Sequence, residues 1–163
     1  MTTYHCAIPS PVGELTLTGD GSVLTGLSFS GGDWEPLIPE GSVESHAAFA
    51  DVITQLEEYF DGTRTDFDLQ LRPKGTEFQL KVWHALRTIP YGHTWSYGEL
   101  ARAIDQPTAF RAVGLANGKN PIAIIVPCHR VIGSNGKLVG FGGGLDNKQI
   151  LLSLESGAKA LFA

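Results

Sequence analysis

Residues 120–131 of the chain read NPIAIIVPCHRV, and this stretch sets the expectations for the C-terminal half. The uninterrupted apolar run over residues 122–126 predicts a fully buried strand. The run ends at Pro127, which is followed by a thiol and an imidazole, Cys128 and His129. A cysteine beside a histidine is a candidate nucleophile, although a buried cysteine can also serve packing alone. Adjacent side chains on a strand point to opposite faces, so His129 can assist Cys128 only if Pro127 turns the chain there.

Two short helices are predicted upstream of this stretch. Ser96 and Glu99 fit a capping box that begins a helix over residues 97–104, and Thr108 is placed to cap a helix over residues 109–117. Short helices joined by a tight turn are the outline of a helix-turn-helix, although many helical proteins contain such a pair.

The second of these helices carries little side-chain bulk apart from Arg111. Its glycine Gly114 costs about 1 kcal/mol in a helix relative to alanine, which indicates that something approaches the helix closely. That partner is either a neighbouring helix or a narrow groove into which the helix is pressed, with Arg111 as its long polar probe. The sequence leaves both readings open.

The first half of the chain reads as a small β-sheet with a helix. Short apolar-rich runs at residues 4–8, 14–18 and 23–29, separated by turn residues, predict an antiparallel meander. Apolar residues at three- and four-residue steps predict a helix over residues 49–60. Residues 67–71 alternate as a half-buried strand or an extended link does.

A domain boundary is expected at residues 72–75, where Arg-Pro-Lys-Gly interrupts the apolar pattern. A new helix begins directly afterwards, because Thr76 and Gln79 fit a second capping box. We therefore expect an N-terminal α/β support domain over residues 1–75 and a mostly helical domain over residues 76–163, which together make an α+β fold.

The composition excludes several classes of protein. With 42% hydrophobic and 18% charged residues, the 163-residue chain has enough apolar side chain for a core and too little charge for disorder. Two cysteines cannot form a disulfide framework, and no stretch approaches the roughly 20 apolar residues of a membrane span. The first residues lack the pattern of a signal peptide. We therefore expect a soluble, cytoplasmic protein that does not bind membranes.

The net charge of −5 hides an asymmetry between the halves. Residues 1–75 hold 3 Lys/Arg and 12 Asp/Glu, whereas residues 76–163 hold 9 Lys/Arg and 5 Asp/Glu. A chain whose halves differ in sign often turns its basic half toward a polyanion, although two solvated surfaces can also differ by chance. Because no uniformly basic tract is present, strong non-specific binding to phosphate is not expected.

The second half resembles the O6-alkylguanine-DNA alkyltransferases, also called methylated-DNA–protein-cysteine methyltransferases. The matching motifs, in the family's order and spacing, are Arg111-Ala112-Val113-Gly114, Asn120-Pro121, Pro127-Cys128-His129-Arg130-Val131, Gly142-Gly143-Gly144-Leu145 and Leu151-Leu152-Ser153-Leu154-Glu155. The resemblance covers residues 76–163 strongly and the first half only in outline. It implies a ribonuclease-H-like N-terminal domain, with a small antiparallel sheet and a helix, and a winged-helix-like C-terminal domain that contains the helix-turn-helix.

Members of this family transfer an alkyl group from the O6 atom of a damaged guanine to a cysteine, which is Cys128 here. The resemblance implies irreversible, single-turnover repair of O6-alkylguanine, and of O4-alkylthymine, because the product is a thioether. It also implies a relay from Cys128 through water to His129 and Glu155, since a free cysteine is only a few per cent ionised near neutrality. Asn120 matches a family residue that braces the turn holding the cysteine.

The O6 atom of a stacked guanine is out of reach of a buried thiol, so the nucleotide must be flipped out of the duplex. The family does this with a helix-turn-helix whose second helix enters the minor groove, which is about 6 Å wide and admits only a slim helix. By resemblance, Arg111 fills the space left by the flipped base and Tyr97 contacts the phosphate beside it. Ala112, Gly114 and Ala116 are expected to face the groove.

The resemblance also places Val139, Phe141 and Gly142 at the substrate pocket. Many family members have a tyrosine at the position of Phe141, whose ring cannot donate a hydrogen bond to O6. The donor is therefore expected to be a backbone N–H, such as that of Gly142 or Cys128, or a water molecule.

Neither a metal nor another cofactor is expected. Some relatives bind zinc in the N-terminal domain, but that half offers only Cys6, His5 and His46, without tetrahedral ligand spacing. The expected partner is duplex DNA bearing O6-alkylguanine, bound through the minor groove by a monomer; whether monomers cluster on DNA stays open. Two alternatives stay open: a non-catalytic sensor of alkyl lesions, which Cys128 counts against, and a helix-turn-helix regulator in which Cys128 is merely buried.

Overall fold

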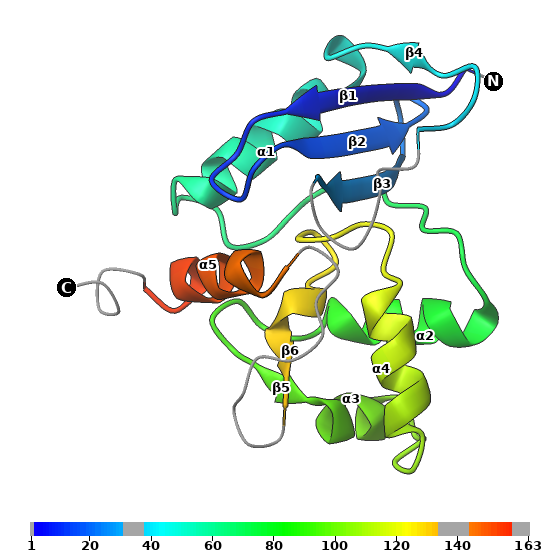
Figure 1. The fold of residues 1–163 in the computed structure, drawn as a ribbon, viewed down its shortest axis with the longest axis vertical. Helices are drawn as coiled ribbons and strands as arrows, with labels where there is room; N and C mark the ends of the chain where they lie inside the picture. The colour runs from blue at the N-terminus through cyan, green and yellow to red at the C-terminus, as the bar shows by residue number, and fades with distance from the viewer. Residues whose placement is uncertain (1, 31–37, 134–143, 158–163) are drawn as a thin grey trace.

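The computed structural model describes residues 2–30, 38–133 and 144–157 (Figure 1). In the first half, β1 (Tyr4–Ile8) pairs antiparallel with β2 (Leu15–Gly19), which pairs antiparallel with β3 (Leu24–Phe29). This is the predicted meander. A short strand, β4 (Val43–Glu44), adds in parallel to the free side of β1, so that the strand order is β3-β2-β1-β4.

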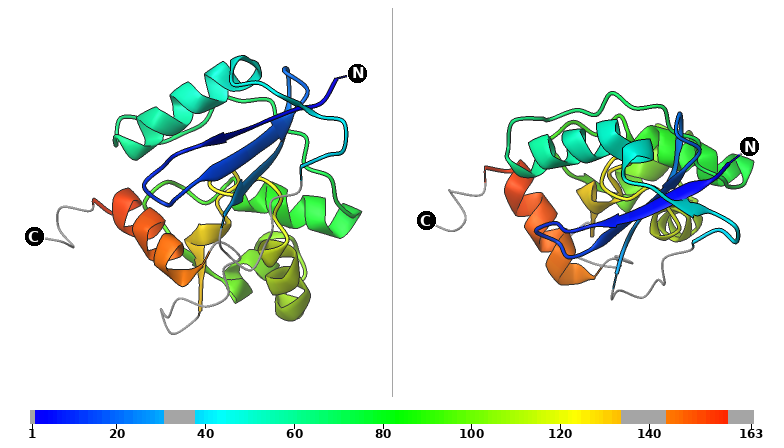
Figure 2. Two further views of the ribbon diagram at one scale, coloured as in Figure 1. Left: turned by 45° about the horizontal axis from the view of Figure 1, so that its top comes forward. Right: turned by 90° about the horizontal axis from the view of Figure 1, so that it is seen from above.

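One face of the sheet is covered by the helix predicted over residues 49–60 (Figure 2). It begins as a 3-10 turn, η1 (Ala47–Phe49), and continues as α1 (Ala50–Phe60). The buried residues of α1 are Val52, Gln55, Leu56 and Tyr59. Their three- and four-residue spacing is the periodicity from which the helix was predicted.

After α1 the chain returns as an extended link, in which Leu71 forms a single β-bridge with Leu24. The remaining elements are α2 (Glu77–Leu86), β5 (Trp95–Ser96), α3 (Tyr97–Ala103), α4 (Phe110–Gly118), η2 (Cys128–Arg130), β6 (Val131–Ile132) and α5 (Leu145–Glu155). β5 and β6 pair in parallel. The fold is α+β, as predicted, with a small sheet followed by a mostly helical half. No helix in the described ranges is long and apolar enough to cross a lipid bilayer.

Two of the three predicted helix caps are confirmed. Thr76 and Ser96 each accept a hydrogen bond from the backbone of the residue three positions on, at 3.1 Å, and each capping box is complete. The cap predicted at Thr108 is wrong, because the N-cap of α4 is Ala109 and has no side-chain hydrogen bond. The Ala109 N–H donates instead to the carbonyl of Gln106 at 2.9 Å, so a tight turn occupies this segment and the helix begins after it.

α3 and α4 form the predicted helix-turn-helix, at the end of the molecule opposite the sheet (Figure 1). Asp105 in the turn between them has a positive φ of 59°, which lets the chain reverse within a few residues. Leu100 and Val113 are completely buried, so each helix turns one face to the core and leaves the other exposed.

The two halves of the molecule are joined along the outer edge of β3. The Leu27 N–H donates to the Pro121 carbonyl at 2.9 Å, and the Leu27 carbonyl accepts from the Ala123 N–H at 3.0 Å. One cluster of buried apolar side chains continues through both halves. The segment that leads to Cys128 is therefore anchored on the sheet of the first half.

The buried strand predicted over residues 122–126 is wrong. Only Ile122 bridges to β3, and the chain then turns. The Ile125 N–H donates to the Ala123 carbonyl at 2.8 Å, and Ile124 between them has a φ of 71°, which is unusual for a β-branched residue. The run is buried as expected, but an apolar run predicts burial and does not by itself distinguish a strand from a turn.

Candidate active site and DNA-binding surface

Asn120 holds the turn that presents Cys128. Its Oδ1 accepts from the Ile122 N–H at 3.0 Å and its Nδ2 donates to the Val126 carbonyl at 2.8 Å, so one side chain spans both ends of the turn. The Cys128 N–H also donates to the Val126 carbonyl, at 2.8 Å across Pro127, and Cys128 then begins η2. The turn expected at Pro127 is therefore present.

The structure brings His129 and Glu155 together inside the protein. His129 Nε2 lies 2.7 Å from Glu155 Oε2, and the two side chains are 0% and 2% exposed. Because a carboxylate only accepts, Nε2 carries the proton and donates it, which leaves the lone pair of the neutral ring on Nδ1. Nδ1 is buried and makes no hydrogen bond with any described residue. His129 is thus held in the tautomer that can accept a proton at Nδ1.

Arg130 balances the charge of Glu155. Its Nε donates to Oε1 at 2.7 Å and its Nη2 to Oε2 at 3.1 Å, while Nη1 donates to the Ile89 carbonyl at 2.7 Å. Its guanidinium lies 5.7 Å from the ring centroid of Tyr91. Burial alone would raise the pKa of Glu155, but the hydrogen bonds and charges of His129 and Arg130 outweigh burial and lower that pKa to about 2. Glu155 is therefore an anion at neutral pH.

Cys128 is a thiol in the resting site. Burial raises the pKa of this thiol, against the hydrogen bond from Asn120 and the charge of Lys148, which both lower it. Burial also lowers the pKa of His129, against the hydrogen bond and charge of Glu155, which raise it. The resting pair is thus a neutral thiol and a neutral imidazole, so the thiolate forms when a proton moves to a base.

Lys148 supplies a buried cation near Cys128. The helical spacing of α5 puts Lys148 on the same buried face as Leu151 and Glu155. Its Nζ donates to the Val131 carbonyl at 2.6 Å. Burial lowers the pKa of Lys148 to about 8, and the charge of Cys128 opposes that shift. An ammonium group at this position favours the thiolate over the thiol.

The residues predicted to face DNA lie on different sides of α4. Arg111 and Ala112 are exposed and Gly114 is half-buried, but Ala116 is only 3% exposed. The Ala116 carbonyl accepts from Trp83 Nε1 at 2.8 Å, so this residue belongs to the inner face of α4. The groove contact predicted for the Ala116 side chain does not fit this position.

Packing within the described part of the chain does not explain the glycines of α4. Among the described residues, a Cβ at Gly114 would meet only the ring of Tyr97, at 3.7 Å, which is an ordinary contact distance, and a Cβ at Gly118 would meet no atom within 4 Å. Of the two readings of the slim helix, close approach by an external partner is therefore favoured. Tyr97 begins α3 beside Gly114, and burial raises its pKa, with a further rise from the charge of Cys128.

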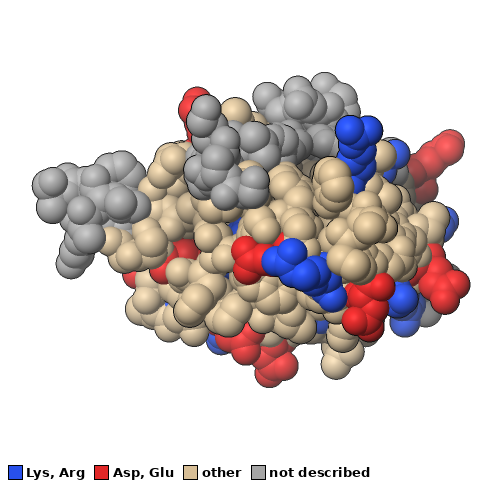
Figure 3. All heavy atoms as spheres, turned by 90° about the horizontal axis from the view of Figure 1, so that it is seen from below, with Lys and Arg blue, Asp and Glu red and all other residues tan. Residues whose placement is uncertain are grey.

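The end of the molecule that holds α3 and α4 is not uniformly basic. Seen from below, its surface is mostly uncharged, with basic and acidic side chains scattered over it and in places side by side (Figure 3). Two large apolar side chains of α4 face solvent, Phe110 at 51% and Leu115 at 70% exposed. This surface suits a partner that is approached closely, rather than one held by charge alone.

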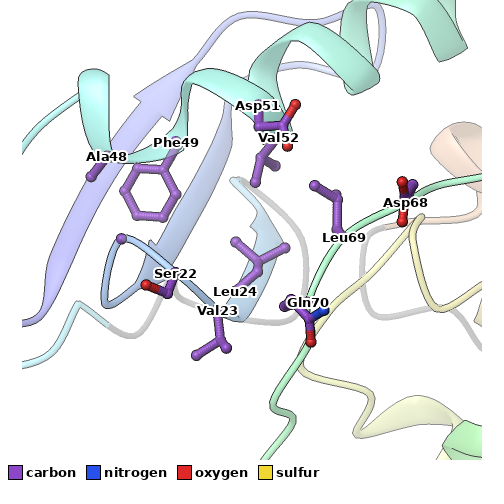
Figure 4. A pocket seen from close by; sticks show the side chains of 11 residues that line it. Ser22, Val23, Leu24, Ala48, Phe49, Asp51, Val52, Asp68, Leu69 and Gln70 are labelled. Carbon is purple, nitrogen blue, oxygen red and sulfur yellow. The ribbon is translucent and has the colours of Figure 1, made fainter.

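The three residues predicted to line the substrate pocket, Val139, Phe141 and Gly142, lie outside the described residues. A hollow of about 180 Å³ lies in the first half, between the β2–β3 turn and α1, and its lining contains none of the predicted site residues (Figure 4). Within the described ranges, no three His, Cys, Asp or Glu side chains gather as metal ligands do.

Three residues of the site were not predicted from the sequence: Tyr59, Arg130 and Lys148. Arg130 lies within the quoted signature, next to its histidine. Lys148 is a charged residue three positions before the buried Leu151, on the same face of the helix. A charge on a buried face was the signal that could have indicated a functional role for Lys148. Tyr59 donates from its hydroxyl to Glu155 Oε2 at 2.5 Å, across 96 residues of sequence. A tyrosine on a core face predicts a buried acceptor for its hydroxyl, but not which one.

Comparisons with known proteins agree with this geometry. The chain matches two family models, described as 6-O-methylguanine DNA methyltransferase, ribonuclease-like domain, over residues 3–73, and 6-O-methylguanine DNA methyltransferase, DNA binding domain, over residues 77–157. The methylated-DNA–protein-cysteine methyltransferase of Mycolicibacterium paratuberculosis is 57% identical over 148 residues, which are 91% of this chain and 89% of the relative. The protein of the same name from Methanosarcina acetivorans is 52% identical, over 93% of this chain and 97% of the relative.

Among solved structures, the crystal structure of Mycobacterium tuberculosis OGT in complex with DNA is similar along almost the whole chain. The TM-score is 0.89 at 52% sequence identity, and the match covers 94% of this chain and 93% of the other. Both family models and these relatives thus agree over both halves of the molecule. This chain belongs to the 6-O-methylguanine DNA methyltransferase family.

Proposed function

We propose that this chain repairs alkylated DNA by transferring the alkyl group from the O6 atom of guanine to Sγ of Cys128. The observation that carries the proposal is the buried His129–Glu155 pair, with Nε2 and Oε2 2.7 Å apart, next to a cysteine held in a tight turn. The relatives named methylated-DNA–protein-cysteine methyltransferase support the same reaction.

The reaction is a displacement at carbon. The Cys128 thiol passes its proton through a water molecule to His129 Nδ1, and Glu155 stabilises the resulting imidazolium as the third member of a triad does. The thiolate attacks the alkyl carbon, so that the S–C bond forms while the C–O6 bond breaks. The guanine leaving group takes up one proton, supplied through water in place of the one that Cys128 gave to His129, and becomes ordinary guanine. The thioether on Cys128 is stable, so each molecule acts once; O4-alkylthymine would react in the same way.

DNA binding in this proposal uses the exposed face of α4. Ala112 and Gly114 let the helix enter the minor groove, and Arg111 fills the space that the flipped base leaves. Tyr97 contacts the phosphate next to the lesion and helps to rotate the nucleotide outward. The room around Gly114 supports this arrangement, because a Cβ there would meet no described atom closer than the Tyr97 ring at 3.7 Å.

The remaining assignments stay predictions. Residues 1–75 act as a support domain and residues 76–163 as the DNA-binding and transfer domain, in a cytoplasmic monomer. Val139, Phe141 and Gly142 complete the substrate pocket. Because Phe141 has no hydroxyl and the Cys128 N–H already donates to the Val126 carbonyl, the Gly142 N–H or a water molecule donates the hydrogen bond to O6.

The replacement Cys128→Ser tests the proposal. This variant should bind methylated duplex as the wild type does and remove no methyl group, whereas Cys6→Ser, which changes the other buried free cysteine, should retain transfer. Transfer by Cys128→Ser would place the nucleophile elsewhere. A wild-type protein that binds the lesion and leaves it intact would be the lesion sensor. A wild-type protein that binds a particular DNA sequence regardless of methylation would be a helix-turn-helix regulator.

A further inference from the structure

Glu155 receives a hydrogen bond from the other half of the molecule. The hydroxyl of Tyr59, on α1, donates to Glu155 Oε2 at 2.5 Å, and the same oxygen accepts from His129 Nε2 at 2.7 Å. Arg130 Nη2 reaches this oxygen at 3.1 Å. The carboxylate oxygen that serves the histidine is therefore held from α1 as well as from its own half.

Tyr59 is a rigid donor. Its side chain is completely buried, and its ring packs against Phe60, Phe67 and Tyr91 with centroids 5.2, 5.4 and 6.3 Å away. Burial raises the pKa of Tyr59, and the negative charge of Glu155 raises it further. The hydroxyl therefore keeps its proton at any physiological pH and acts only as a donor toward the carboxylate.

We propose that Tyr59 is a positioning residue for alkyl transfer, whose hydroxyl fixes the Glu155 carboxylate so that His129 keeps its proton on Nε2 and its lone pair on Nδ1. The inference rests on the proposed function, because it requires His129 to take the proton of Cys128. A carboxylate that holds a histidine in one tautomer is decisive in triad chemistry, and Tyr59 extends that control by one further hydrogen bond. The first half of the chain thereby takes part in the reaction.

Several other charged or titratable groups face the relay, and the replacement Tyr59→Phe leaves each of them in place. They are Tyr97 from α3, Arg130 from η2, Lys148 from α5 and Tyr91 from the segment after α2. Tyr91 provides a matched control, because it belongs to the same aromatic cluster and its hydroxyl donates to the Leu154 carbonyl, at 3.4 Å, rather than to Glu155.

The replacement Tyr59→Phe keeps the ring and removes the hydroxyl. In DNA-free protein, the pH midpoint for alkylation of Cys128 by iodoacetamide, followed by peptide mass, should rise by roughly 1 pH unit, equivalent to a tenfold smaller thiolate fraction. Methyl transfer from duplex at pH 7 should slow about tenfold, less than the loss of a general base itself, and should recover at alkaline pH. Tyr91→Phe should leave the midpoint and the rate unchanged.

A double variant shows whether Tyr59 acts through Glu155. Added to Glu155→Gln, the replacement Tyr59→Phe should shift the midpoint no further. Three results would overturn the inference and leave the proposed function standing. They are an unchanged midpoint in Tyr59→Phe, a transfer rate that falls equally at every pH, and a full additional shift of the midpoint in the double variant. A wild-type protein that accepts no methyl group from DNA would overturn the proposed function instead.

Discussion

Arg130 and Glu155 form a two-point ion pair inside the protein, with Nε 2.7 Å from Oε1 and Nη2 3.1 Å from Oε2. Their side chains are 8% and 2% exposed, so both charges have lost most of their hydration. The carboxylate that completes this pair is also the partner of His129. Stability and chemistry therefore depend on the same side chain.

The replacement Glu155→Gln should damage both properties. Removing one charge of a buried pair leaves the other uncompensated, which should lower the free energy of unfolding by about 3–5 kcal/mol. Methyl transfer should slow by about 100-fold or more, because His129 loses the anion that stabilises its protonated form. Urea unfolding and single-turnover kinetics measure the two effects. Glu58→Gln, which breaks the partly exposed pair between Glu58 and Arg64, should cost less than about 1 kcal/mol. An equal cost for both variants would contradict the larger contribution assigned to the buried pair.

Acid should remove the stabilisation that Glu155 provides. Its pKa is about 2 in the folded protein against 4.5 as the ordinary value, so the unfolded chain binds more protons between these limits. The contribution of ionised Glu155 to the free energy of unfolding is on the order of 3 kcal/mol. It is fully present above about pH 4.5 and is lost as the pH falls toward 2. The difference in unfolding free energy between wild type and Glu155→Gln should therefore shrink across this range. A difference that stays constant with pH would show that the carboxylate is not perturbed by folding.

The replacement Gly114→Ala should change stability and repair in opposite directions. Alanine is the better helix former by about 0.5–1 kcal/mol, and a Cβ at this position clashes with no described residue, so unfolding should require more denaturant. The added methyl group should hinder entry into the minor groove and slow transfer from duplex DNA. Reaction with the free base O6-methylguanine, which needs no groove, provides the control. Unchanged repair of duplex DNA by Gly114→Ala would contradict the proposal that Gly114 lets α4 enter the minor groove.

The replacement Arg111→Ala should act only where a base must be flipped. Arg111 is exposed, so its loss should change the free energy of unfolding by no more than about 0.5 kcal/mol. Transfer from methylated duplex should fall far more than reaction with the free methylated base. Equal losses on the two substrates, measured by single-turnover kinetics, would refute the role of Arg111 as the residue that fills the emptied stack.

The helices of this chain could be predicted because their signals are local. The capping boxes at Thr76 and Ser96 involve residues three positions apart, and the apolar face of α1 repeats within eleven residues. The strand predicted over residues 122–126 was wrong because the signal used, an apolar run, does not report the backbone conformation. The turn in this segment depends on the Asn120 side chain and on a positive φ at Ile124, neither of which an apolar run reveals.

The site could be predicted in part. Cys128 and His129 were singled out as a thiol beside an imidazole, Glu155 was assigned through motif resemblance, and the structure places His129 and Glu155 in contact. The donor that Tyr59 supplies to Glu155 could not be found, because no local pattern specifies which buried acceptor a core tyrosine will meet. Ala116 was assigned to the groove by composition, but its position on α4 turns it toward Trp83. Composition describes a helix, whereas its orientation is decided by packing.

The mass of the intact protein after incubation with excess O6-methylguanine duplex tests most directly whether Cys128 accepts the alkyl group. Each chain should gain one methyl group, located on the peptide that contains Cys128, with no second gain when more DNA is added. An unmodified chain, a methyl group on any other residue, or repeated removal of lesions by one molecule would contradict it.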